Sequence, residues 1–171
     1  GTIILSVADG HGSKACPYSR TGSRIAVNVF CGIMKNLCDG YAEHSEQLVT
    51  YLNREGDTRI SKAIDAEWKR RVIEAHRKNK REIAAMEGGS DDLKRVYKQY
   101  GTTLLGLLIT KTFVFALQLG DGDICYANAS GLELVIEPEK MLGVETHSLS
   151  RDNAWEKAMT VVRRFDLADH L

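Results

Sequence analysis

A short apolar run that ends abruptly in a polar turn constrains this chain more than any other feature. The run Ile3–Ala8 has the length and composition of a buried strand. Asp9, Gly10, His11 and a second glycine follow it without a break. Glycine marks the point where a chain turns out of a sheet. We therefore expect Asp9 to lie at the rim of a sheet, with its carboxylate at a sharp bend.

The residue types at this bend suit a hard divalent cation, which prefers oxygen ligands. Asp9 supplies a carboxylate, and Gly10 has no side chain to shield its carbonyl. His11 carries an imidazole that gains or loses a proton near neutral pH. The alternative is an ordinary Asp-Gly turn that closes a strand and binds nothing.

Apolar residues at helical spacing predict most of the first hundred residues to be helical. The expected helices are one capped by Thr21 or Ser23 and ended by Gly40, a short one within 41–55, a long one from Asp57 to Gly88-Gly89, and a short one over 90–99. The pattern then changes to strands at 102–110, 113–119, 124–128 and 132–136, with short turns between them. Consecutive strands joined this way predict an antiparallel meander. A further short helix is expected within 150–165, which gives an α+β layered domain.

Composition narrows the class of protein. The 171 residues fit a single domain over 1–171, and Lys and Arg together (23) equal Asp and Glu together (23). A net charge of zero gives no global attraction to nucleic acid or to an anionic membrane. The four cysteines lack C-x-x-C spacing, which favours reduced thiols and a cytoplasmic location. Cys31 and Cys38 are expected to be buried or half-buried on one side of a helix.

A basic run on the long helix leaves a second partner class open. Arg70, Arg71, Arg77 and Lys78 lie on it, but glutamates interleave with them and no aromatic platform accompanies them. A solvated helix face is the favoured interpretation, with a nucleic-acid patch as the alternative.

Three motifs, in order along the chain, carry a resemblance to a known family. Val7-Ala8-Asp9-Gly10-His11-Gly12, then Gly101-Thr102-Thr103, then Gly120-Asp121-Gly122-Asp123 resemble the landmarks of the metal-dependent protein serine/threonine phosphatases of the protein phosphatase 2C family. The segment 142–150 resembles a loop of a bacterial-type branch of that family. The matches are spread over nearly the whole chain.

The resemblance implies a fold. Members of the family fold as a four-layer α-β-β-α sandwich, in which two antiparallel sheets pack face to face and a helix pair covers each. The helices that begin near residues 21 and 58 would form one such pair. The family also has phosphate and metal ligands before the first motif and two aspartates after the last. This chain is therefore expected to be the central portion of such a domain, incomplete at both ends, and to bind metal weakly by itself.

The resemblance also implies a reaction and roles. Two Mg²⁺ or Mn²⁺ ions hold the water that hydrolyses phosphoserine or phosphothreonine in a phosphoprotein. Asp9 would bridge the two ions, the Gly10 carbonyl would bind one, and His11 would be the general acid. Asp121 would lie near a weaker third metal site, although Gly122 stands where the family has serine; a turn carboxylate is the alternative. Thr102 and Thr103 are expected to hydrogen-bond beneath the site.

Other interpretations remain open. A phosphatase-like domain that binds or regulates without catalysis is the main alternative, and a nucleic-acid module on the basic helix is a third. The remaining histidines, His44, His76, His147 and His170, have no ligand spacing and are expected at the surface. A phosphoprotein is the expected partner, with no nucleic acid and no membrane.

Overall fold

The structure is a computed structural model that describes residues 1–79, 90–128, 131–137 and 147–165. The strands are β1 (Ile3–Val7), β2 (Leu104–Ile109), β3 (Phe113–Leu119), β4 (Cys125–Asn128), β5 (Gly131–Leu134) and β6 (Met159–Arg164). The helices are α1 (Ser19–Gly40), α2 (Ser45–Glu55), the π-helical η1 (Gly56–Ile60), α3 (Ser61–Lys78), α4 (Ser90–Lys98) and the 3-10 helix η2 (Ala154–Lys157). Among the described residues, no helix has the length and apolarity that a membrane span requires.

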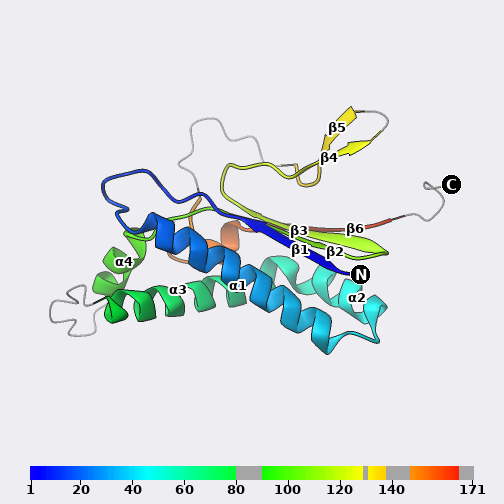
Figure 1. Cartoon of the computed structure of the whole chain (residues 1–171), viewed down its shortest axis with the longest axis horizontal. Coiled ribbons are helices and arrows are strands. Elements are labelled where there is room, and N and C mark those ends of the chain that lie inside the picture. Colours follow the sequence, from blue (N-terminus) through cyan, green and yellow to red (C-terminus); the bar gives the residue numbers. More distant parts are fainter. Residues whose placement is uncertain (80–89, 129–130, 138–146, 166–171) are drawn as a thin grey trace.

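Four antiparallel strands form the main sheet, in the order β1-β2-β3-β6 (Figure 1). The register places Val7 opposite Leu105, and Leu105 opposite Gln118. Along β2 the side chains alternate between buried and half-buried, because successive residues of a strand point to opposite faces. The sheet therefore has two apolar faces that meet different surroundings.

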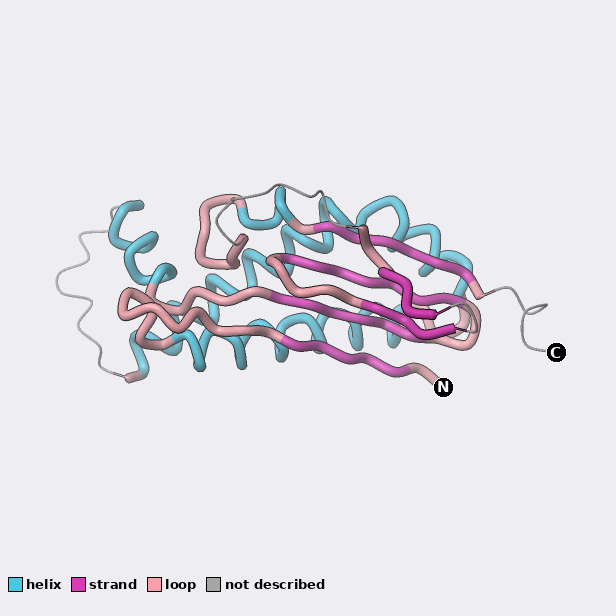
Figure 2. The backbone as a smooth tube through the Cα atoms, turned by 90° about the horizontal axis from the view of Figure 1, so that it is seen from above, coloured by secondary structure: helices cyan, strands magenta, loops and turns pink. Residues whose placement is uncertain are grey.

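Helices α1, α2 and α3 lie against one face of the sheet (Figure 2). Phe30 of α1 packs so closely on Gly106 of β2 that a Cβ there would come within 2.3 Å of its ring. Trp68 of α3 is fully buried and donates its indole N–H to the Gly22 carbonyl of α1 at 2.9 Å. These contacts confirm the predicted pairing of the two long helices over one sheet.

The other face of the sheet is apolar and only partly covered. Ile3, Leu5 and Val7 of β1 are 55%, 51% and 66% exposed. The β4–β5 hairpin forms a separate sheet, and the residues at its ends pack with Ala116 of β3 in a small second apolar cluster. Within the described residues the fold is therefore a helix layer on a four-stranded sheet, with a hairpin over part of the far side. This is an α+β arrangement.

Two sequence predictions for the strands are wrong. The expected meander breaks after β3, because β3 pairs with β6 and β4 pairs with β5 in its own sheet. The expected helix over 150–165 is only η2, followed by β6. Thr160, Val161 and Val162 are β-branched and favour a strand, and pairing with β3 satisfies backbone groups that would otherwise form a free edge.

The predicted helix starts also need correction. α1 begins at Ser19 with no side-chain cap, so Thr21 and Ser23 do not cap it, although it ends at Gly40 as expected. Asp57 does not begin a helix, since the chain is helical without a break from α2 through η1 into α3. The Ser61 hydroxyl donates to the Gly56 carbonyl at 2.7 Å and satisfies the carbonyl across the π turn. The stop expected at Gly88-Gly89 lies outside the described residues.

We predict that Gly22→Ala destabilises the fold strongly while Gly32→Ala, on the same helix, does not. A Cβ at Gly22 would lie 1.9 Å from the Tyr100 carbonyl oxygen, whereas a Cβ at Gly32 meets nothing within 4 Å. Overpacking should cost about 1–3 kcal/mol of unfolding free energy. Replacing an unhindered helical glycine should instead gain roughly 0.5–1 kcal/mol. Urea unfolding followed by circular dichroism measures both; equal effects would contradict the packing described for α1.

Candidate functional site

The predicted turn after β1 is held against a second segment that lies far away in the sequence. Thr103 N–H donates to the Asp9 carbonyl at 3.0 Å, and His11 N–H donates to the Gly101 carbonyl at 3.0 Å. Between these two bonds Gly10 lies opposite Thr102 as an isolated bridge. The pairing of β1 with β2 therefore continues past the end of the strand and through the turn.

Two threonine hydroxyls reinforce this pairing, as the sequence predicted. Thr102 Oγ1 donates to the Asp9 carbonyl at 2.9 Å, and Asp9 N–H donates to Thr103 Oγ1 at 3.0 Å. Both threonines are buried, while the Asp9 side chain is exposed. The backbone of Asp9 is thus fixed on the sheet side, and its carboxylate faces solvent.

The Gly10 carbonyl is directed outward by the same pattern. In an antiparallel pair flanked by two hydrogen bonds, the paired residues turn their own N–H and C=O groups away from each other. Gly10 also lies directly against Ser19 at the start of α1, where a Cβ would come within 2.8 Å of backbone atoms. Only glycine fits between the sheet and the helix here, which is the physical reason for this residue after Asp9.

His11 rests on the other glycine of the pairing. A Cβ on Gly101 would lie 2.5 Å from His11 Cδ2, 3.2 Å from Ser150 Oγ and 3.4 Å from Cys16 Sγ. The imidazole is therefore placed over Gly101, next to a hydroxyl and a thiol. The sequence did not identify Ser150 or Cys16 as neighbours of the site, because only the folded chain brings them to Gly101.

The structure places Asp121 near the same support. Gly120 has a φ of +117°. It lies against the Thr103 side chain, since a Cβ on Gly120 would come within 2.6 Å of Thr103 Cγ2. Asp121 follows it in an exposed turn. Thr103 is thus in contact with both the Asp9 turn and the Gly120–Asp121 turn. One buried residue therefore packs against both segments that contain the predicted carboxylates.

The donor types at the turn fit a hard cation, but their number is small. Asp9 offers one exposed carboxylate and Gly10 one carbonyl, both oxygen donors. In the part of the chain that the structure describes, no group of three or more His, Cys, Asp or Glu side chains could hold a metal ion. A metal site built on Asp9 and the Gly10 carbonyl would therefore need ligands in addition to these two.

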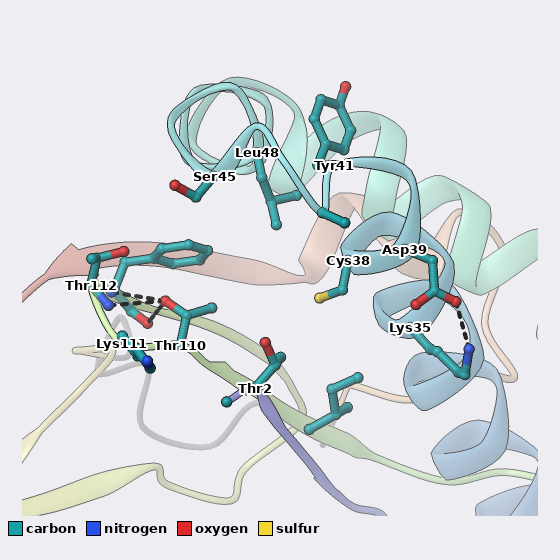
Figure 3. Close-up of a pocket in the computed structure, with 14 residues that line it drawn as sticks. Thr2, Lys35, Cys38, Asp39, Tyr41, Ser45, Leu48, Thr110, Lys111 and Thr112 are labelled. Carbon is teal, nitrogen blue, oxygen red and sulfur yellow. Dashed lines mark hydrogen bonds and ion pairs between the residues drawn. The ribbon is translucent and has the colours of Figure 1, made fainter.

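Two cavities of the described molecule lie away from this turn. One, of about 610 Å³, opens between the end of α1, the start of α2 and the β2–β3 turn (Figure 3). Its lining includes Thr2, Cys38, Leu48 and Thr110, and none of the predicted site residues. A smaller one, about 260 Å³, is lined mainly by residues of 147–157. Donor chemistry, and not the size of a hollow, therefore locates the candidate site.

The described residues test the expectation that the remaining histidines lie at the surface. His76 was expected at the surface but is 3% exposed, with Nδ1 3.2 Å from the Tyr100 hydroxyl oxygen. Its position four residues after the buried Val72 on α3 was a signal that the sequence offered. His44 is exposed and His147 half-buried, and His170 lies outside the described residues.

Arg70 and Arg71, in the basic run on α3, form ion pairs with glutamates of the same helix. Arg70 pairs with Glu67 at 2.7 Å and with Glu74 at 3.2 Å, and Arg71 pairs with Glu67 at 2.7 Å. The two arginines lower the pKa of Glu67 to about 2. This geometry is that of a solvated, ion-paired helix face.

The cysteines form no disulfide. All four are free. Burial raises the pKa of Cys31 and of Cys38, and neighbouring Asp39 raises that of Cys38 further. Both are half-buried, as predicted from their spacing on α1.

The comparison with protein families agrees with the motifs at this turn. A family model described as protein phosphatase 2C matches residues 1–168. The chain belongs to the protein phosphatase 2C family. No curated protein matches the sequence. Membership of the protein phosphatase 2C family accounts for the order of the three motifs, and the structure shows that all three segments meet around Thr103.

We predict that Gly101→Ala displaces the His11 imidazole, whereas Gly12→Ala leaves it in place. The new methyl carbon would lie 2.5 Å from His11 Cδ2, so the ring would have to move. A Cβ on the neighbouring Gly12 would meet nothing within 4 Å. The His11 ring C–H resonances in NMR spectra report the change. A large shift in Gly101→Ala and a small one in Gly12→Ala is the expected result; the reverse would show that the ring does not rest on Gly101.

Proposed function

We propose that this chain carries the central part of the active site of a metal-dependent phosphatase that hydrolyses phosphoserine and phosphothreonine in proteins. The observation that supports it best is the rigid turn Asp9–His11, which combines an exposed carboxylate, an outward carbonyl and an imidazole. A phosphoprotein partner and a cytoplasmic location belong to the same proposal. The assignment to a bacterial-type branch stays a prediction.

In this proposal each residue has one task. Asp9 and the Gly10 carbonyl would hold Mg²⁺ or Mn²⁺, and Asp121 would contribute from the neighbouring turn. His11 would give its proton to the serine or threonine oxygen as the phosphorus–oxygen bond breaks, because an alkoxide is a poor leaving group. Bound divalent cations would supply water activation at neutral pH and charge neutralisation for the phosphoryl group.

The proposal requires more ligands than the described residues provide. The carboxylates of Asp9 and Asp121 and one carbonyl cannot offset the charge of two dications. We infer that further carboxylates come from outside the described residues. We also infer that a second antiparallel sheet covers the row formed by Ile3, Leu5 and Val7, and that a helix pair on that sheet completes the four-layer sandwich. An exposed row of this kind otherwise favours association between chains.

The proton-donor role has a specific test. Phosphatase activity with Mn²⁺ is measured on a phosphothreonine peptide and on p-nitrophenyl phosphate, for the chain alone and for the chain together with any natural sequence that flanks it. His11→Asn should lower kcat on the peptide by roughly 10²–10⁴-fold. The loss on p-nitrophenyl phosphate should be far smaller, because nitrophenolate leaves without a proton. Asp9→Asn should remove activity on both substrates.

The control is His44→Asn, an exposed histidine that lies outside the site. It should leave both activities unchanged. An equal loss on the two substrates in His11→Asn would mean that His11 does not protonate the leaving group.

A non-catalytic, phosphatase-like binding domain is the second candidate. It is favoured by the absence of a three-ligand cluster among the described residues. Lack of Mn²⁺-dependent hydrolysis in both forms of the protein, together with retained binding of a phosphopeptide, would establish it.

The proposed second sheet predicts that Leu5→Thr affects stability differently in the two forms. In the chain alone Leu5 is 51% exposed, so the change should leave stability nearly unaltered and reduce binding of a hydrophobic dye. Where a second sheet covers the residue, the change should cost about 1–3 kcal/mol. Thermal unfolding compares them, with Leu108→Thr in the buried core as a control that destabilises both. Identical behaviour of Leu5→Thr in both forms would argue against a covering sheet.

A further inference from the structure

The segment 147–150 reaches the candidate site from the far end of the sequence. Ser148 is 4% exposed. Its hydroxyl hydrogen-bonds to both the N–H and the carbonyl of Thr102. Thr102 N–H donates to Ser148 Oγ at 3.1 Å, and Ser148 Oγ lies 3.2 Å from the Thr102 carbonyl oxygen. Leu149 N–H donates to that same carbonyl at 3.0 Å. Ser148 therefore extends the sheet pairing by one more segment beyond Thr102.

Thr102 passes this restraint to the turn. Its own hydroxyl donates to the Asp9 carbonyl at 2.9 Å, and its backbone lies opposite Gly10. A side chain in the 147–150 segment is thus two hydrogen bonds from Asp9. Ser150 adds a second link, because its Oγ lies 3.0 Å from Ser148 Oγ and its hydroxyl faces Gly101 beside His11.

The same segment is anchored on the helix layer. Lys69 Nζ of α3 donates to the Arg151 carbonyl at 3.0 Å and pairs with the buried Asp65 at 2.9 Å. Lys94 of α4 pairs with Asp152 at 2.7 Å. The segment after Ser148 is therefore tied to two helices, so that Ser148 has a fixed base from which to hold Thr102.

We propose that Ser148 is a positioning residue for the Asp9–His11 turn, which acts through the backbone of Thr102. Serine suits the task because one small hydroxyl accepts the Thr102 N–H and still has a proton to donate. Without it, the buried Thr102 N–H loses its partner, and on the side away from β1 only the Leu149 N–H still bonds to Thr102. The consequence for catalysis rests on the proposed phosphatase function; the effect on the turn does not.

Hydrogen exchange measured by NMR on the whole chain tests the effect on the turn. The amides of His11 and Thr103 report it, since they donate to Gly101 and Asp9. In Ser148→Ala their exchange should accelerate on the order of tenfold, as expected for one lost buried hydrogen bond. The exchange rate of the Phe115 amide, in the centre of the sheet, should not change once any difference in global stability is corrected for.

Ser61→Ala is the matched control. Ser61 is 3% exposed and its hydroxyl also donates to a backbone carbonyl, but it lies at the start of α3. It should leave His11 and Thr103 exchange unaltered. Ser150→Ala, in which the side chain is only half-buried, gives a second variant that should fold readily and show a smaller acceleration in the same direction. Equal acceleration at all amides in Ser148→Ala, or none at His11 and Thr103, would overturn the proposal.

Kinetics separate this inference from the proposed function. In a protein with Mn²⁺-dependent activity, Ser148→Ala should lower kcat roughly tenfold to a hundredfold with little change in KM, because the reacting groups are misplaced after substrate binds. Ser61→Ala should not. If no form of the protein hydrolyses phosphate esters, the proposed function fails, and the exchange rates at His11 and Thr103 alone decide the role of Ser148.

Discussion

The pairing of Asp9–His11 with Gly101–Thr103 is the interaction on which the rest of the structure depends. It joins segments 94 residues apart, as in the bond from Asp9 N–H to Thr103 Oγ1. Closing so long a loop has an entropic cost that two backbone bonds cannot offset. The helix layer provides the compensation: α1, α2 and α3 fill the intervening sequence and bury one face of the sheet. The turn is therefore ordered because the core beneath it is ordered, and the site is a product of tertiary packing rather than of local sequence.

The contact between the core and the turn is direct. Gly22, in the first turns of α1, lies against the Tyr100 carbonyl, one residue before the pairing begins. Trp68 then fixes the same glycine through its indole N–H. A change in helix packing is therefore transmitted to Gly101 over a single residue. Sites whose first contacts are supported by a close-packed layer tolerate little displacement, because packed interiors respond to strain as a unit.

How much the sequence predicted depends on whether a signal was local. The strand Ile3–Val7, the helix ending at Gly40, and the two strands of the β2–β3 hairpin have strong local periodicity, and they were found where expected. β6 was missed because its apolar residues fit a helical spacing as well as a strand, and only its pairing with β3 decides between them. The role of Thr102 beneath the turn came from the motif. Ser150 and Cys16 had no such signal, because nothing in the order of residues states that they meet Gly101. His76 shows the opposite case. Its position four residues after the buried Val72 on α3 indicated burial, but the residue type suggested exposure.

The turn is held by backbone groups and neutral hydroxyls, and this has a consequence for any cation that it binds. If charged side chains oriented Asp9, loss of a cation or a change of pH would alter the geometry together with the charge. Here Thr102 and Thr103 hold the peptide groups of Asp9, while its carboxylate stays exposed and hydrated. A single exposed carboxylate is inexpensive to maintain in water, whereas several brought together repel one another until a cation neutralises them. In the proposed metal site, the described residues would therefore form the part whose geometry does not depend on a cation, and any further carboxylates around Asp9 would be the groups that need the cation for their stability.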